Sequence, residues 1–251
     1  MEHYKGRHIG CAPGTHHALA LLVDRNVNDR ESVLDFGAHS GALLERLRDI
    51  GFFRLTGADL DNTRFDVPGG CFLKVDLNGP FDEGISARYS LITATDVIEH
   101  LNSPREFLTR ARNLLRDDGY IGLSLPNIAF WEGRLKFMLT GEHWGFGERN
   151  YRSQRHISPV TKEQMFLMMQ EIGLEVVASK TAGSFSTWLR RLIFAPLYLP
   201  IRLFGGPWTF GESAIYLAKK VEPDSNLEMP THYVDRWQGI PDRIGLDITS
   251  G

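Results

Sequence analysis

The sequence predicts an α/β fold in which helices cover both faces of a doubly wound, mainly parallel sheet. Three observations support this prediction. Short apolar runs alternate with segments whose apolar residues recur at helical spacing. Two glycines, Gly37 and Gly41, follow the first apolar run and precede a helix. Acidic residues stand at the ends of three successive runs, at Asp35, Asp59 and Asp76.

The first half of the chain supplies the parallel part of the predicted sheet. A helix over 15–24 precedes the first strand, and a second helix over 42–50 follows the glycine pair and ends at Gly51. We assign no catalytic role to His16 and His17, which lie on the first, amphipathic helix. The expected strands are 32–36, 53–59, 71–75, 89–95 and 120–125.

A further helix is expected between the fourth and fifth strands. Ser103 is its N-cap, Pro104 occupies the first helical position and Glu106 is the capping-box partner. We expect this helix to end at Gly119, directly before the strand over 120–125.

The second half begins with 128–151, rich in glycine and aromatic residues, which we expect to form a helix and a loop over the site. Thr161 and Gln164 then cap a helix that ends at Gly173 and whose methionines follow core spacing. Two more strands are expected at 174–180 and 213–219.

Composition fits one α/β domain over residues 1–220, followed by a polar tail over 221–251 without a usable motif. The chain has 251 residues, 42% of them hydrophobic, and a net charge of −3, which offers no global attraction to nucleic acid. Its two cysteines do not form a disulfide framework. No apolar signal core follows Met1, so we expect a cytoplasmic protein.

The turn after the first strand is suited to a ligand that carries both a positive and a negative group. A strand that turns through glycines into a helix brings backbone N–H groups to an anion. Asp35, at the end of that strand, would repel a pyrophosphate and attract an ammonium group. Asp59 lies about 20 residues past the glycines, where doubly wound nucleotide folds place the acid that holds ribose hydroxyls; Asp61 is a nearby alternative.

The segment Asp35-Phe36-Gly37-Ala38-His39-Ser40-Gly41 resembles motif I of the class I S-adenosylmethionine (SAM)-dependent methyltransferases, usually Asp-x-Gly-x-Gly-x-Gly, with His39 at the middle glycine. The resemblance covers about residues 33–180 and is closest to the group that includes the ubiquinone, sugar and polyketide O-methyltransferases. It implies a Rossmann-like, seven-stranded sheet that ends in an antiparallel hairpin, and SAM as cofactor. The implied cofactor residues are Asp35, Gly37, Gly41, Asp59, Asp76 (at the adenine amino group), Leu77 and Asp96.

A second cluster follows the fourth strand. Asp96, Glu99 and His100 have the spacing of one helical turn, which permits either a capping box or a site for chemistry. The resemblance extends to a Glu-x-x-Glu-His run that binds a divalent metal in the ubiquinone O-methyltransferases and in small-RNA 2′-O-methyltransferases. By that likeness Asp96, Glu99, His100 and His156 are candidate metal ligands, although Asp96 replaces the expected glutamate.

His100 and His156 are also the candidate general bases, because an imidazole can accept a hydroxyl proton near neutral pH. The resemblance therefore implies methyl transfer to a hydroxyl of a small molecule, glycan or lipid-linked acceptor. An RNA 2′-O-methyltransferase and a SAM-binding partner protein without transferase activity are the alternatives. No basic stripe with interleaved aromatics supports RNA binding.

An apolar insertion with basic residues, 184–211, precedes the last expected strand. Its core, 188–204, contains Arg190, Arg191 and Arg202 and is too short and too charged to span a membrane. Packing on the domain or on a second subunit as a homodimer is one interpretation. Peripheral contact with a membrane surface is the other.

Overall fold

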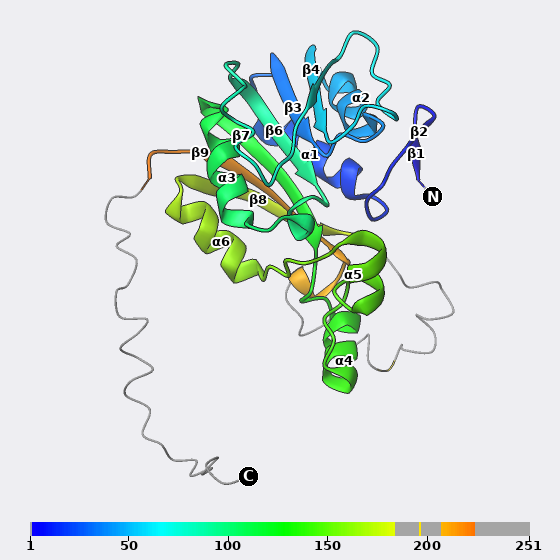
Figure 1. The fold of residues 1–251 in the computed structure, drawn as a ribbon. Coiled ribbons are helices and arrows are strands. Elements are labelled where there is room, and N and C mark those ends of the chain that lie inside the picture. The colour runs from blue at the N-terminus through cyan, green and yellow to red at the C-terminus, as the bar shows by residue number, and fades with distance from the viewer. Residues whose placement is uncertain (1, 184–195, 197–206, 224–251) are drawn as a thin grey trace.

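A seven-stranded sheet forms the centre of the protein, shown in Figure 1 as a computed structural model that describes residues 2–183, 196 and 207–223. Its strand order is β5-β4-β3-β6-β7-β9-β8. The strands are β3 (Ser32–Phe36), β4 (Arg54–Asp59), β5 (Cys71–Lys74), β6 (Tyr89–Thr95), β7 (Leu115–Pro126), β8 (Leu174–Ala182) and β9 (Ser213–Lys220).

Six strands run in the same direction, and β9 runs opposite to them and forms an antiparallel hairpin with β8. β3 pairs in parallel with β4 and β6, and β9 lies antiparallel between β7 and β8. This is the topology that the resemblance implies, with the glycine turn after β3, which lies between β4 and β6. Because parallel strands share one carboxyl edge, the strand-end acids of β3, β4 and β6 are brought to the same side.

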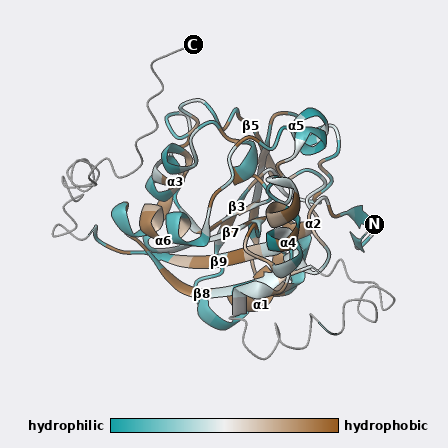
Figure 2. Cartoon of the chain, turned by 90° about the horizontal axis from the view of Figure 1, so that it is seen from below, coloured by the Kyte–Doolittle hydropathy of each residue, from teal (hydrophilic) through white to brown (hydrophobic). Residues whose placement is uncertain are grey.

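Helices cover both faces of the sheet. α1 (Thr15–Asn26) and α2 (Ala42–Asp49) bury Leu19 and Leu44 in the apolar cluster on one face, while α3 (Pro104–Asn113) and α6 (Lys162–Glu171) bury Phe107 and Met165 in the cluster on the other. Figure 2 shows the hydrophobic colour of β8 and β9 between α1 and the α3–α6 side. Adjacent residues of β3 point to opposite faces of the sheet: Val33 packs in one apolar cluster, and Leu34 and Phe36 pack in the other. Every position of this strand is therefore buried.

The predicted N-caps Ser103 and Thr161 are confirmed, but the predicted capping box at Ser103 is not formed, because the Glu106 carboxylate accepts hydrogen bonds from Arg110 instead. The Ser103 hydroxyl accepts a hydrogen bond from the Glu106 backbone N–H at 3.3 Å. At α6, the Thr161 hydroxyl accepts from the Gln164 N–H at 3.1 Å and the Gln164 side chain accepts from the Thr161 N–H at 2.9 Å, which completes a capping box.

The predicted end of α3 at Gly119 is wrong. α3 ends at Asn113, and the chain enters β7 at Leu115, which pairs with Tyr89. The register then shifts between Tyr89 and Leu91. Gly119 lies within this irregular stretch, where an added Cβ would stand 3.0 Å from the Tyr89 carbonyl oxygen. This glycine therefore permits close strand approach and does not terminate the helix.

The aromatic segment after β7 forms two helices where one was expected. α4 (Trp131–Thr140) and α5 (Glu148–Gln154) lie beyond the end of the sheet (Figure 1). The expected Thr15 start of α1 is correct, but a hairpin of β1 (His3–Tyr4) and β2 (Arg7–His8) precedes it and was not predicted. Tyr4 and Lys5 bond to Asp49 of α2, which holds the hairpin beside the glycine turn.

The membrane and dimer interpretations of 188–204 concern residues outside those described, apart from residue 196, and so does nearly all of the 221–251 tail. Among the described residues, no helix combines the length and the apolar character needed to cross a bilayer.

Candidate functional site

A cavity of about 200 Å³ lies at the carboxyl ends of β3, β4 and β6. Four predicted cofactor residues line it: Asp35, Gly37, Asp59 and Asp96. Another side is lined by His8, at the end of β2, and by Gly10 and Cys11 from the segment between β2 and α1. The Ser40 hydroxyl donates to the His8 carbonyl at 2.7 Å, which ties this segment to the glycine turn.

The turn requires backbone conformations that favour glycine. Gly37 and Gly41 have φ of 70° and 76°, and a Cβ on them would lie 2.6 Å from Val97 and 2.1 Å from Val67. His39, at the motif's middle glycine, also has a positive φ of 46°. It therefore takes the left-handed conformation despite its side chain. Its N–H donates to Asp59 Oδ2 at 3.0 Å, which fixes the turn against β4.

Asp35 is a buried acid at the base of this cavity. Its side chain is 2% exposed, and the Thr93 hydroxyl donates to its Oδ1 at 2.7 Å. Burial raises the pKa of Asp35 to about 7, and the Thr93 hydrogen bond opposes the shift only in part. A cation bound next to Asp35 would restore its charged form, so the site is suited to an ammonium group.

The other predicted acids differ in position. Asp59 lines the cavity, whereas Asp61 is exposed and accepts hydrogen bonds from Thr63 in its own turn. Asp76 is also exposed and accepts from the Asn78 N–H at 2.9 Å. Neither Asp76 nor Leu77 is among the residues that line the cavity, so their contact with adenine stays a prediction.

A second, larger cavity of about 530 Å³ lies against the α4–α5 helices. Asp96 lines both cavities. Glu212, just before β9, and His156, in the loop after α5, line the second cavity, and the lining residues Lys136 and Arg149 belong to α4 and α5. The arrangement provides adjacent compartments for two reactants.

Asp96 holds a strained backbone position between them. Its φ is 51°, a conformation that side chains other than glycine rarely adopt. Its N–H donates to the Ser124 hydroxyl at 3.0 Å, and that hydroxyl donates to Asp96 Oδ1 at 2.6 Å. Burial raises the pKa of Asp96. β7 thus fixes the backbone and the carboxyl of this residue together.

Glu99, His100 and His156 form the predicted second cluster without Asp96. One ligand atom from each of the three lies within 4.8 Å of the others. Glu99 and His100 belong to η1 (Ile98–His100), a short 3₁₀ helix whose N-cap, Val97, makes no side-chain cap, so the alternative of an Asp96 capping box is not found. The Glu99 carbonyl accepts from the Ile157 N–H at 2.8 Å, which brings His156 beside η1.

The hydrogen bonds and burial of this cluster indicate the protonation of His156 and Glu99. Nδ1 of His156 lies 2.8 Å from the Gly145 carbonyl, so it carries the proton and leaves Nε2 as an acceptor. Burial lowers the pKa of His156. Glu99 is 1% exposed, its Oε2 has no hydrogen-bond partner, and burial raises its pKa well above the usual range.

Sequence reasoning missed two side chains that face the cavities. His16 of α1 lines the smaller cavity, although its place on an amphipathic helix gave no reason to assign it a functional role. Glu212, just before β9, lines the second cavity, and burial raises its pKa to about 7. No local pattern identifies Glu212, because only the sheet pairing of β9 with β7 brings it there.

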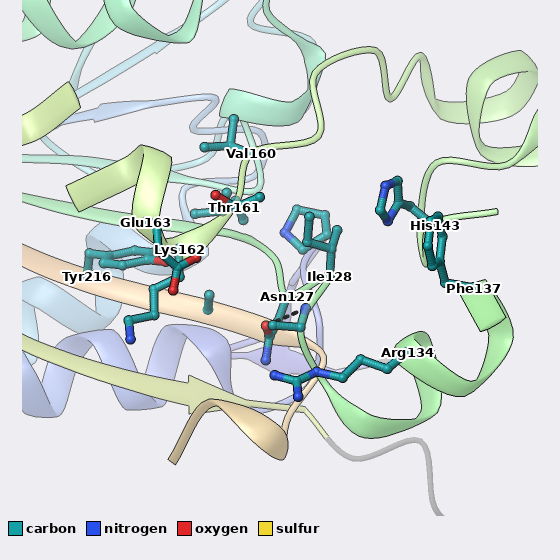
Figure 3. A pocket seen from close by; sticks show the side chains of 14 residues that line it. Asn127, Ile128, Arg134, Phe137, His143, Val160, Thr161, Lys162, Glu163 and Tyr216 are labelled. Atoms are coloured by element: carbon teal, nitrogen blue, oxygen red, sulfur yellow. Dashed lines mark hydrogen bonds between the residues drawn. The ribbon is translucent and has the colours of Figure 1, made fainter. Parts of the chain in front are cut away.

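A third cavity, of about 250 Å³, lies between the end of β7, β9 and the start of α6. Figure 3 shows Asn127 at its centre, with Lys162 and Tyr216 on one side and His143 on the other. The Asn127 amide donates to the carbonyls of Trp208 and Gly211 at 2.9 and 2.8 Å. Asn127 therefore joins the end of β7 to the segment before β9, and its role here is structural.

The chain is similar in fold to solved structures of methyltransferases. A SAM-dependent methyltransferase from Archaeoglobus fulgidus matches 82% of this chain and 94% of its own length, with TM-score 0.54 and 17% identity. A putative methyltransferase from Bacillus halodurans matches 82% of this chain and 98% of its own, with TM-score 0.56 and 15% identity. An O-methyltransferase family protein from Burkholderia thailandensis matches 83% of this chain and 56% of its own, with TM-score 0.57 and 13% identity. No curated protein sequence matches the chain.

The sheet order and the glycine turn after β3 define a class I methyltransferase fold. A family model described as a methyltransferase domain matches residues 11–179. The chain therefore belongs to the methyltransferase domain family.

Proposed function

We propose that this protein transfers a methyl group from SAM to a hydroxyl oxygen of an acceptor bound in the second cavity. The observation that carries the proposal is that Asp96 lines both cavities. Two reactants held in them would meet beside this residue, and fixing their orientation is the main source of rate in such a transfer.

The smaller cavity offers complementary groups for SAM. Asp35 supplies a carboxylate for the ammonium, and the N-terminus of α2 after Gly41 supplies backbone donors for the carboxylate. Asp59, which lines the same cavity, would accept hydrogen bonds from the ribose hydroxyls. The methyltransferase family of this chain and the SAM-dependent neighbour from A. fulgidus support this assignment.

His156 supports transfer to oxygen. Its Nε2 is free to accept the proton of an acceptor hydroxyl while the oxygen takes the methyl group from sulfur, and the electron pair of the broken bond stays on sulfur. A positioned base contributes roughly 10²–10⁴-fold to such a step. His100, whose ring centroid lies 4.8 Å from that of His156, is the second candidate for this role.

A divalent metal ion is a second candidate feature of the same site. The cluster offers one carboxylate, from Glu99, and two imidazoles, from His100 and His156, with one ligand atom of each within 4.8 Å of the others. Glu99 Oε2 has no hydrogen-bond partner in the described part of the chain. When bound, such an ion would lower the pKa of an acceptor hydroxyl. Under this proposal His156 Nε2 is a ligand, its orientation set by the Gly145 carbonyl.

The second cavity favours a small polar acceptor or one unit of a glycan or lipid-linked molecule. Lys136 and Arg149 provide positive charge from the helices, and Glu212 and Asp96 provide acids at the sheet. An RNA 2′-hydroxyl is the alternative acceptor, and a binding protein without transferase activity is the alternative function.

Label transfer tests the proposal. Purified protein and SAM with an isotopically labelled methyl group are incubated with a cell extract, and metabolites, lipids and RNA are analysed separately by mass spectrometry. We expect a labelled metabolite, glycan or lipid heavier by one CH₂ unit, and no product with the Asp35→Ala variant. Label in RNA would select the alternative acceptor. Binding of SAM without any labelled product would contradict transferase activity.

A further inference from the structure

His16 is a buried polar side chain in the wall of the smaller cavity. It lies in the first turn of α1 and is 7% exposed. Its Nε2 is 3.3 Å from the Thr95 hydroxyl, at the end of β6. Its Nδ1 is buried and has no hydrogen-bond partner in the described part of the chain. A buried nitrogen without a partner is costly, so this atom points to a ligand group that completes it.

The imidazole is neutral and can donate one hydrogen bond. Burial, and then the positive charge of Arg46, lowers the pKa of His16 to about 3. If the Thr95 hydroxyl donates to Nε2, the ring proton resides on Nδ1. Nδ1–H is then a donor without an acceptor in the described part of the chain, and an anionic or carbonyl oxygen would complete it.

The position of His16 selects which part of SAM it meets. His39, the other cavity histidine with a buried, unpartnered ring nitrogen, bonds through its backbone to Asp59 at the proposed ribose end. His16 contacts Thr95, which belongs with Asp96 to the β6 end of the cavity. The SAM ammonium and carboxylate share one carbon atom, so a donor for the carboxylate must lie in the compartment that contains Asp35.

We propose that His16 Nδ1–H binds the carboxylate of the amino-acid moiety of SAM, alongside the backbone donors of the glycine turn. This inference rests on the proposed binding of SAM in the smaller cavity. His16 is then a specificity residue for the amino-acid end of the cofactor, which distinguishes SAM from adenosyl ligands without a carboxylate.

The experiment compares three ligands by calorimetric titration: SAM, decarboxylated SAM, and 5′-methylthioadenosine, which lacks the whole amino-acid moiety. The variants are His16→Phe, which removes the donor, and His16→Asn, which keeps an N–H near the position of Nδ1. His17→Phe, at the exposed neighbouring position on the same helix, is the matched control.

A hydrogen bond to a charged group corresponds to about ten-fold or more in affinity. We expect His16→Phe to weaken SAM by that factor and to leave decarboxylated SAM and methylthioadenosine unchanged. His16→Asn should recover part of the SAM affinity, and His17→Phe should bind all three ligands as the wild type does.

The ratio of SAM to decarboxylated SAM affinity decides the inference, because a general loss of folding weakens both ligands equally. An unchanged ratio in His16→Phe would overturn it, as would a loss confined to methylthioadenosine. Failure of the wild type to bind any of the three ligands would instead refute the proposed function.

Discussion

At the scale of single residues, the buried acid Asp35 in β3 is the group through which we expect pH to affect cofactor binding. Asp35 has a pKa of about 7 in the folded protein because it is buried, and its usual value is near 4. Its protonated form therefore stabilises the ligand-free protein below the unfolded pKa, and this contribution is lost as the pH rises through about 7. Binding of an ammonium group requires the ionised form of Asp35. We therefore expect ligand affinity to increase as the pH rises.

We predict that SAM affinity increases as the pH rises from about 5.5 to about 7.5, below the range in which α-amino groups lose their protons. Calorimetric titration in buffers with different ionisation enthalpies should show that binding releases a proton in this range. Asp35→Asn should bind weakly with no such release. An affinity that is independent of pH in the wild type would refute the role of Asp35.

Asp59 gives a second prediction at this scale. Asp59→Asn should lose SAM affinity by about ten-fold or more, since it removes a charged acceptor for hydrogen bonds. Its effect on 2′-deoxy-SAM should be smaller. Asp61→Asn is the matched control, because Asp61 is exposed and lies outside the cavity lining. Equal losses for both ligands would show that Asp59 acts only through the turn, by its bond to His39.

At the scale of elements, η1 and the loop after α5 meet to form the Glu99, His100 and His156 cluster. If this cluster binds a metal, exhaustive chelation should abolish turnover, and one divalent ion should restore it. Glu99→Gln and His100→Ala should each lose metal binding in a direct titration, whereas His143→Ala, outside the cluster, should not. Full activity in chelator, with no metal found by elemental analysis, would leave His156 as a base without an ion.

Elements with strong local patterns could be predicted from the sequence. β3 and β6 have the predicted limits, since continuous apolar runs next to helices specify buried parallel strands. The β1–β2 hairpin could not be found, because its two-residue strands carry no periodicity and depend on distant Asp49 and Asp66. The early start of β7 depends on pairing with Tyr89, which local sequence does not contain.

Some residues of the candidate site could be identified from the sequence, and others could not. Asp35, Gly37 and Asp59 follow strands in a recognisable order, so the sequence located the smaller cavity. His16 was given no catalytic role, because its place on an amphipathic helix cannot distinguish a buried packing position from a cavity wall. Asp96 was placed with the metal cluster by its spacing, but its positive φ turns it toward Ser124.

At the scale of the whole molecule, one prediction concerns residues outside those described. The apolar run over 188–204, with Arg190 and Arg191, stays a candidate for peripheral membrane contact or a dimer interface. Under the membrane interpretation, the protein should float with anionic liposomes at low salt and lose this association when both arginines become glutamate. Protein that remains in solution with every liposome composition would exclude it.

The central claim is that the cavity at the ends of β3, β4 and β6 binds the methyl donor. Hydrogen exchange with and without saturating S-adenosylhomocysteine tests it most directly, because protection reports where a ligand lies along the chain. We predict slower exchange in the glycine turn around Gly37–Gly41, in the start of α1 and at Thr95–Asp96. Protection confined to the third cavity around Asn127, or no protection at saturation, would contradict the account.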